Sequence, residues 1–226
     1  MKYTIATLKK WNIKNAYELQ KSRLDDDILI ITSKEGLTSE HLSGAEFVFF
    51  PHWSYLIPEE IFEKFTCIVF HMTDLPYGRG GSPLQNLIAR GHNSTKISAL
   101  RVTKDVDGGD IYMKRELSLY GGAEEIYMRA SKIVFTDMIP SILDNFPKPV
   151  PQEGNVVIFN RRKPADSELL PEMSIEQIFD HIRMLDAEGY PHAFVRFGGY
   201  IMEFTRPKNI CDGVVADVKI RRAECG

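Results

Sequence analysis

The chain has 226 residues, of which 43% are hydrophobic and 26% charged, and its formal net charge is -3. This length and ordinary globular composition suit one large domain, or one medium domain with a small appendix. Neither the first 150 residues nor the remainder carries an excess of lysine and arginine, so charge gives no support to a nucleic-acid partner.

The three cysteines, Cys67, Cys211 and Cys225, form no Cys-x-x-Cys pair. This argues against a disulfide framework or a thiolate metal site, so we expect no metal, and it indicates a reducing compartment. The first residues lack the long apolar core of a signal peptide, and no apolar stretch approaches the roughly 18 residues that a membrane helix needs. We therefore expect a cytoplasmic protein without a membrane partner.

Short apolar runs alternate with helical patterns in the first part of the chain. Buried strands are predicted at 2–8, 25–32, 45–51 and 66–71. Between the last two, a helix is predicted at 57–64, where Pro58 and two glutamates suit a first turn. Strands separated by short helices are typical of parallel βαβ units, so the predicted fold class is α/β, a mostly parallel sheet with helices on both faces.

Ser82 and Pro83 suit the N-cap and the first residue of a helix that Gly91 ends. Residues 95–119 alternate at a period of two around an Asp-Gly-Gly turn, as in a hairpin-like pair of strands. Residues 123–143 have apolar positions at the three-to-four spacing of a long helix.

Three prolines in the segment 144–155 predict a stiff linker or a domain edge. We therefore expect an α/β domain over residues 1–150 and a small helix-plus-β domain over residues 151–226. The elements predicted in the second domain are an amphipathic helix at 174–186, a hairpin around Gly198-Gly199 and a final strand at 213–220.

Two glycine-rich turns invite ligand-binding interpretations. "PYGRGGSP" (76–83) could cradle phosphate, but Pro83 stands where a dinucleotide fingerprint needs glycine, and no P-loop Gly-Lys-Ser/Thr follows. "DVDGGD" (105–110) fails as a calcium loop, because Gly109 and Asp110 stand where that motif has Asp/Asn and Gly. Both are compatible with simple tight turns; the functional alternative for the second is one carboxylate projecting from a strand end into a site.

His71 ends the apolar run "CIVF". A lone histidine there is by default a half-buried polar group. An acid on a nearby strand end and a glycine turn would instead make a general acid/base site. The aromatic stretch 49–58 is either a packed loop or a flat apolar slot for a heteroaromatic ring.

These motifs, in this order, resemble the folate-dependent formyltransferase family, which includes methionyl-tRNA formyltransferases and amino-sugar N-formyltransferases. That family carries a strand ending Asn-x-His, then Ser-Leu-Leu-Pro-x-x-x-Gly, a helix and a later Leu-Asp-x-Gly turn. Residues 71–84 follow this line without a gap, and Val106-Asp107-Gly108-Gly109 matches the later turn. "FNRRKPADSEL" (159–169) resembles the segment that opens the family's C-terminal domain. The resemblance spans residues 45–205.

The resemblance implies a formyltransferase-type Rossmann-like fold with a small α+β C-terminal extension. It implies that His71 polarises the formyl oxygen and assists proton transfer, while Asp107 holds its charge state and relays a proton through water. It also implies 10-formyltetrahydrofolate as formyl donor, with the pterin held by the loop 53–58 and the turn 104–107. The residues expected to contact the donor are Trp53, Tyr55, Leu56, Ile57, Lys104, Asp105 and Val106.

One position departs from the family pattern. The family's asparagine, whose amide donates to the developing oxyanion, falls at Val69. Removing one such donor typically costs about 10²- to 10³-fold in rate. We expect another side chain to supply this donor in place of the asparagine, namely Thr73, Ser54 or His52, unless the protein has lost the reaction.

The acceptor amine is left open by the resemblance. Residues 151–226 are few and hold more acids than bases, which is the opposite of what sustained phosphate contact requires. We therefore expect a small amine, such as a nucleotide-linked amino sugar, ahead of initiator Met-tRNA. A catalytically idle folate- or nucleotide-binding homologue is a third hypothesis. The oligomeric state stays open, with a dimer among the options.

Overall fold

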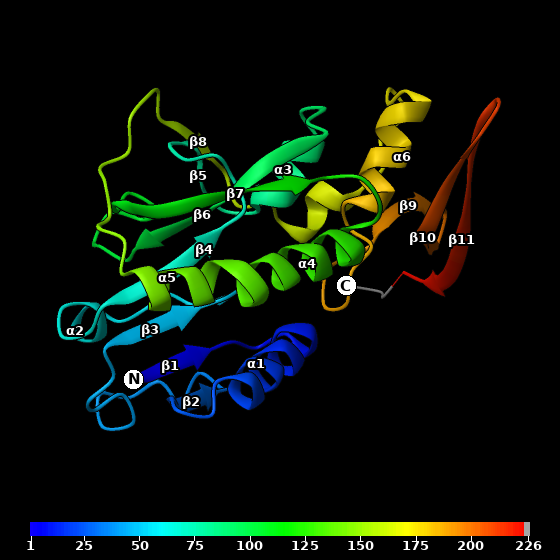
Figure 1. Ribbon diagram of the computed structural model, residues 1–226. Helices are drawn as coiled ribbons and strands as arrows, with labels where there is room; N and C mark the ends of the chain where they lie inside the picture. Colours follow the sequence, from blue (N-terminus) through cyan, green and yellow to red (C-terminus); the bar gives the residue numbers. More distant parts are fainter. Residues whose placement is uncertain (224–226) are drawn as a thin grey trace. The chain divides into compact units, whose positions relative to one another are not determined.

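The computed structural model describes residues 1–223. They form two compact units, each built from discontinuous segments of the chain (Figure 1). Unit 1 consists of Met1–Gly80, Thr95–Leu117 and Met128–Ile158, and unit 2 of Gly81–Ser94, Ser118–Tyr127 and the residues from Phe159 onward. Cys225 lies outside the described residues, whereas Cys67 and Cys211 are free thiols.

Unit 1 is built on a six-stranded sheet in the order β2-β1-β3-β4-β6-β7. The strands are β1 (Lys2–Ala6), β2 (Asp27–Ile31), β3 (Phe47–Phe50), β4 (Cys67–His71), β6 (Ser94–Arg101) and β7 (Ile111–Ser118). The first four pair in parallel, and β6 runs antiparallel to β4 with Ser98 opposite His71. The predicted α/β fold class with a mostly parallel sheet is confirmed.

Helices cover both faces of this sheet. They are α1 (Lys10–Ser22), α2 (Glu59–Phe62), α4 (Ala123–Ile133) and α5 (Ile139–Asn145), the last two joined by a π-helical turn, η1 (Val134–Met138). Ile61 of α2 packs in a cluster with Phe50 and Cys67. On the opposite face, the Phe47 ring lies 6.1 Å from that of Phe146, just after α5. Since side chains alternate along a strand, His71 shares the α2 face with Cys67.

Helix α1 was not predicted from the sequence. Its buried positions are Asn12, Ala16 and Leu19, so its inward stripe includes a polar residue and gives a weak periodic signal. The Asn12 side chain can be buried because its amide donates a hydrogen bond to the Pro51 carbonyl at 3.2 Å. The helix predicted at 123–143 is present, but the π-helical turn interrupts it.

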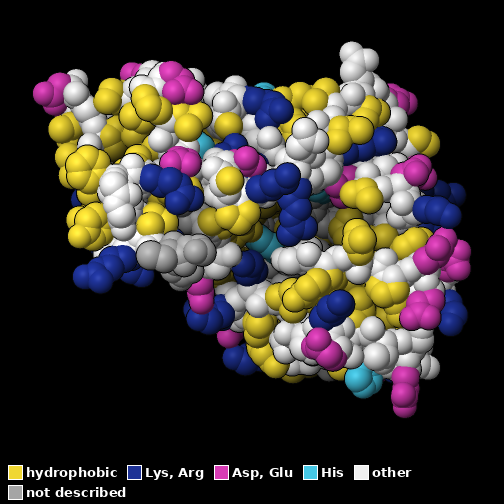
Figure 2. Space-filling view, turned by 180° about the vertical axis from the view of Figure 1, so that it is seen from behind, with side chains coloured by type: hydrophobic (Ala, Val, Ile, Leu, Met, Phe, Trp, Pro, Cys, Tyr) yellow, Lys and Arg dark blue, Asp and Glu magenta, His cyan; other side chains and the backbone are white. Residues whose placement is uncertain are grey.

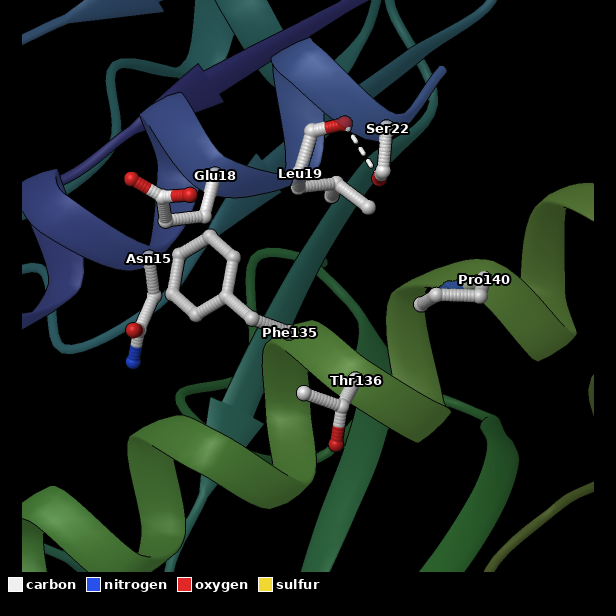
Figure 3. Close-up of a pocket in the computed structure, with 7 residues that line it drawn as sticks. All are labelled: Asn15, Glu18, Leu19, Ser22, Phe135, Thr136 and Pro140. Atoms are coloured by element: carbon white, nitrogen blue, oxygen red, sulfur yellow. Dashed lines mark hydrogen bonds between the residues drawn. The ribbon is translucent and has the colours of Figure 1, made fainter.

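A groove of about 310 Å³ lies between α1 and the η1–α5 segment (Figure 3). Its lining residues are Asn15, Glu18, Leu19, Ser22, Phe135, Thr136 and Pro140. None of them belongs to the motifs that the sequence singled out.

Unit 2 holds α3 (Pro83–Ile88), α6 (Ile175–Arg183) and a three-stranded antiparallel sheet in the order β11-β10-β9. The strands are β9 (Ala193–Phe197), β10 (Tyr200–Ile210) and β11 (Gly213–Arg222). The predicted helix, hairpin and final strand are therefore confirmed, as is a small C-terminal β extension. Figure 2 shows hydrophobic side chains gathered over β10 and β11, and Val218 and Ile220 are among the exposed ones.

Three short elements complete the described chain. A two-stranded sheet joins β5 (Tyr77–Gly80) to β8 (Val157–Phe159), and η2 (Pro164–Ser167) is a turn of 3₁₀-helix. Ser82 does precede α3, but its hydroxyl caps nothing there and instead accepts a hydrogen bond from the Arg162 backbone N–H at 3.1 Å. Within residues 1–223, no helix combines the length and apolarity that a bilayer span demands.

His181 on α6 makes stability pH-dependent. It is 8% exposed, and burial, with the nearby Arg162 charge, lowers its pKa from 6.5 to about 4. Between these values the unfolded chain binds a proton that the folded chain does not, so stability falls as the pH falls through this window. At about 1.4 kcal/mol per unit, the loss reaches about 3 kcal/mol.

We expect His181→Gln to lose less unfolding free energy than wild type between pH 7 and pH 4.5, as measured by urea denaturation. His41→Gln is the matched control, because His41 is exposed and hydrogen-bonds only locally, to the Gly36 carbonyl. Parallel pH profiles for wild type and His181→Gln would contradict the assignment.

Candidate active site

His71 occupies the carboxyl end of β4 and is 8% exposed. Its Nε2 lies 2.7 Å from the Gly78 carbonyl oxygen. Because a carbonyl only accepts, Nε2 carries the hydrogen and donates it. The other ring nitrogen, Nδ1, lies 3.6 Å from Asp107 Oδ2. That separation is too long for a hydrogen bond but short enough for charge pairing when the ring is protonated.

Asp107 reaches His71 by an indirect route. The turn between β6 and β7 leaves the sheet at the amino end of β4, where the Val102 N–H donates to the Cys67 carbonyl at 2.9 Å. It then folds back, so that Asp107 meets His71 at the other end of that strand. Asp107 Oδ2 also accepts from the Gly80 backbone N–H at 2.9 Å. The carboxylate therefore arrives from a returning turn and not from a neighbouring strand end.

Backbone geometry in this turn depends on glycine. A Cβ added at Gly109 would lie 1.9 Å from the Arg101 carbonyl oxygen, a distance that requires the backbone to move. We expect Gly109→Ala to lower the free energy of unfolding by about 1–3 kcal/mol, as overpacking typically does. Urea denaturation measures this, with Gly213→Ala as control, because nothing lies within 4 Å of a Cβ there. Equal unfolding midpoints for the two variants would contradict the predicted destabilisation by Gly109→Ala.

The three residues expected to replace the family's asparagine differ in how accessible their hydrogen-bond donors are. Thr73 is fully buried, and its hydroxyl donates to the Gly78 carbonyl at 3.3 Å. His52 is half-buried beside Trp11, and burial, then the Lys9 charge, lower its pKa to about 4, which leaves its ring neutral at pH 7. Ser54 is exposed. Its hydroxyl is therefore the one of the three that solvent and ligands reach most freely.

The loop 53–58 and the turn 104–107 are brought together. Trp53, Ile57 and Val102 pack against the same apolar cluster of β3, β4 and α2. Lys104 Nζ lies 3.8 Å from Glu59 Oε1, which ties the turn to the first residue of α2.

The side chains expected to hold a pterin differ in exposure. Tyr55, Leu56 and Val106 are 48%, 84% and 62% exposed. Asp105 has an exposed side chain, and its carbonyl accepts from the Gly108 N–H at 3.0 Å. Trp53 Nε1 is buried without a hydrogen-bond partner among the described residues. An unused donor beside exposed apolar surface fits a heteroaromatic ring.

Val69 lies on the same face of β4 as His71, two residues before it. Its side chain packs against the cluster of Leu75, Leu100 and Ile111. Val69 occupies the position of the family's asparagine, but its contacts are apolar. It therefore offers no hydrogen-bond donor on the face of β4 that carries His71.

The structure adds residues that sequence reasoning missed. The Ser98 hydroxyl, fully buried, donates to the Thr73 carbonyl at 2.7 Å and accepts from the Leu75 N–H at 3.4 Å. Gln152 contacts the Asp107 turn from the proline-rich segment. Neither position carries a sequence signal, because a serine in a strand and a glutamine in a linker are both ordinary.

Comparisons with known proteins agree on one class. A structure titled methionyl-tRNA formyltransferase from Clostridium thermocellum is 55% identical, with a TM-score of 0.97, over 98% of this chain and 99% of that one. A sequence profile described as the methionyl-tRNA formyltransferase C-terminal domain matches residues 164–221. A likely sugar N-formyltransferase from Mycobacterium tuberculosis shares the fold at 16% identity, with a TM-score of 0.70 over 87% of this chain and 92% of that one.

A curated relative, the methionyl-tRNA formyltransferase of Lactobacillus acidophilus, is 29% identical over 57% of this chain but only 42% of its own length. The chain thus spans about half the length of the curated relatives it matches. Fold and site together define an α/β protein of formyltransferase type. The chain belongs to the formyltransferase family, and the resemblance seen in the sequence is confirmed.

Proposed function

We propose that this protein transfers a formyl group from 10-formyltetrahydrofolate to a primary amine. The contact between His71 Nδ1 and Asp107 Oδ2, at 3.6 Å, is the observation that carries the proposal. An idle binding homologue would not need a buried imidazole paired with a carboxylate. Family membership and the surface around Trp53 and Tyr55 support the folate donor.

The reaction needs charge stabilisation and proton movement. As the acceptor nitrogen bonds to the formyl carbon, the bond from that carbon to the folate nitrogen breaks. The acceptor nitrogen loses a proton and the folate nitrogen gains one. When the ring is protonated, His71 Nδ1, which lies beside Asp107, carries the hydrogen that the backbone does not use, and in the proposed reaction it donates that hydrogen to the formyl oxygen. Asp107 stabilises the protonated ring and relays the proton through water.

Methionyl-tRNA is the first candidate acceptor. The 55% identical structure carries that name over nearly its whole length, and this outweighs the expectation of a small amine drawn from charge alone. A nucleotide-linked amino sugar is the second candidate. One observation favours it: residues 151–226 hold more acids than bases.

The test incubates the full chain with 10-formyltetrahydrofolate and either charged initiator tRNA or a panel of nucleotide-linked amino sugars. Release of tetrahydrofolate is followed by absorbance. We expect release with Met-tRNA. Release with sugars alone would select the second acceptor, and folate binding without release from any amine would overturn the proposed activity.

Val69→Asn tests the missing oxyanion donor. Asparagine would bring an amide into apolar contacts, so we expect the free energy of unfolding to fall by about 1–3 kcal/mol. The same amide would face the formyl oxygen beside His71, and we expect kcat to rise by about 10²-fold. Urea denaturation and initial rates measure the two effects. An unchanged kcat would show that another group, such as Ser54, already donates.

A further inference from the structure

Gln152 lies in the proline-rich segment that follows α5 and contacts two separate pieces of unit 1. Its side-chain Nε2 donates to the Asp107 carbonyl and to the Gly109 carbonyl, each at 2.8 Å. Its Oε1 accepts from Arg79 Nε at 3.0 Å and from Arg79 Nη2 at 2.8 Å. These four hydrogen bonds use the full capacity of the amide.

The orientation of this amide follows from its neighbours. A flipped amide would set Oε1 against two carbonyl oxygens and its NH₂ against a guanidinium, and every contact would be repulsive. Only one orientation satisfies the turn and Arg79 together. Gln152 therefore joins β5 to the β6–β7 turn with a defined geometry.

The segment that carries Gln152 is itself anchored on both sides. Val150 exchanges two backbone hydrogen bonds with Ile111, the first residue of β7, at 2.8 and 2.9 Å. Val157 N–H donates to the Pro76 carbonyl at 3.3 Å. A side chain on a segment held at both ends loses little freedom when it binds, so Gln152 is well placed to hold its partners still.

The two pieces that Gln152 joins are those that hold the candidate catalytic pair. The β5 piece supplies the Gly78 carbonyl to His71 Nε2 and the Gly80 N–H to Asp107 Oδ2. The turn supplies Asp107, a non-glycine residue with φ of +53°. Such a conformation is uncommon and persists where surrounding contacts hold it. Gln152 donates to the carbonyl of this residue and to the carbonyl of Gly109, two residues later.

We propose that Gln152 is a positioning residue that sets the Asp107 carboxylate against His71. The role rests on the proposed formyl transfer, in which that pair moves the proton. Without the amide, the turn loses both bridging hydrogen bonds and the carboxylate shifts from the ring. A displacement of about 1 Å at a reacting group costs up to about 10²-fold in rate.

The experiment compares Gln152→Ala and Gln152→Glu with Glu153→Ala. Glutamate keeps the size of the side chain but removes both donors, and Glu153 is the exposed neighbour in the same segment. We expect kcat to fall about 10- to 100-fold in both Gln152 variants, with Glu153→Ala like wild type. In an Asp107→Asn background, Gln152→Ala should cause no further loss, because its effect passes through that carboxylate.

A second readout does not depend on turnover. In the full chain labelled with ¹⁵N-histidine, the His71 ring signals, assigned by their absence from His71→Gln, should move in both Gln152 variants and stay in place in Glu153→Ala. Unchanged ring signals, or additive losses with Asp107→Asn, would overturn the positioning role. Absence of turnover in wild type would instead count against the proposed formyl transfer, and the ring signals would still decide the role of Gln152.

Discussion

His71→Ala is expected to lower kcat for formyl transfer by about 10²- to 10⁴-fold, the usual loss when a general acid/base is removed. The ring donates through Nε2 to the Gly78 carbonyl and presents Nδ1 to Asp107, and alanine supplies neither group. Initial rates of tetrahydrofolate release at saturating donor and amine measure the effect. KM for the donor should change little, since the surface that we propose for the pterin is made by the loop 53–58 and the turn 104–107.

A second substitution separates chemistry from folding. His71→Gln keeps an amide that can donate to the Gly78 carbonyl but cannot exchange a proton near neutral pH. We expect it to be as slow as His71→Ala while unfolding closer to wild type in urea. His41→Ala, at an exposed histidine, should be fully active. Activity within tenfold of wild type in either His71 variant would refute the assignment of His71.

Asp107→Asn is expected to lower kcat by about 10²- to 10³-fold, within the range for loss of a proton-relay group. Asparagine tolerates the left-handed backbone of this position, where φ is +53°. It also keeps an oxygen that can accept from the Gly80 N–H. The substitution therefore removes the negative charge beside His71 Nδ1 and leaves the turn in place.

Asp110→Asn is the matched control for Asp107→Asn. Asp110 belongs to the same turn, where its carbonyl accepts from the Arg101 N–H at 2.9 Å, a bond that the substitution preserves. We expect wild-type rates from it. An equal fall in kcat in the two variants would mean that the rate depends on the charge of the turn in general. It would contradict a specific role for Asp107.

Much of the fold could be predicted because local patterns and burial agree along the chain. The β-branched run at Cys67–His71 became the buried strand β4, and the amphipathic pattern that starts at 174 became α6, where the Ser174 hydroxyl accepts from the Gln177 N–H at 3.3 Å. The motif around His71 pointed to the formyltransferase family before any coordinates. Helix α1 was missed because its inward stripe contains Asn12, which a hydrogen bond to Pro51 makes suitable for burial.

The sequence by itself determined the strand carrying His71, the turn carrying Asp107 and the family to which they belong, because these depend on residue types at short spacing. Only the tertiary structure decided that the turn starts at the far end of β4 and folds back to the ring. Likewise, only the fold put Gln152, 45 residues beyond Asp107, between that turn and Arg79 of β5. Such contacts depend on the paths of distant segments, which local pattern does not encode.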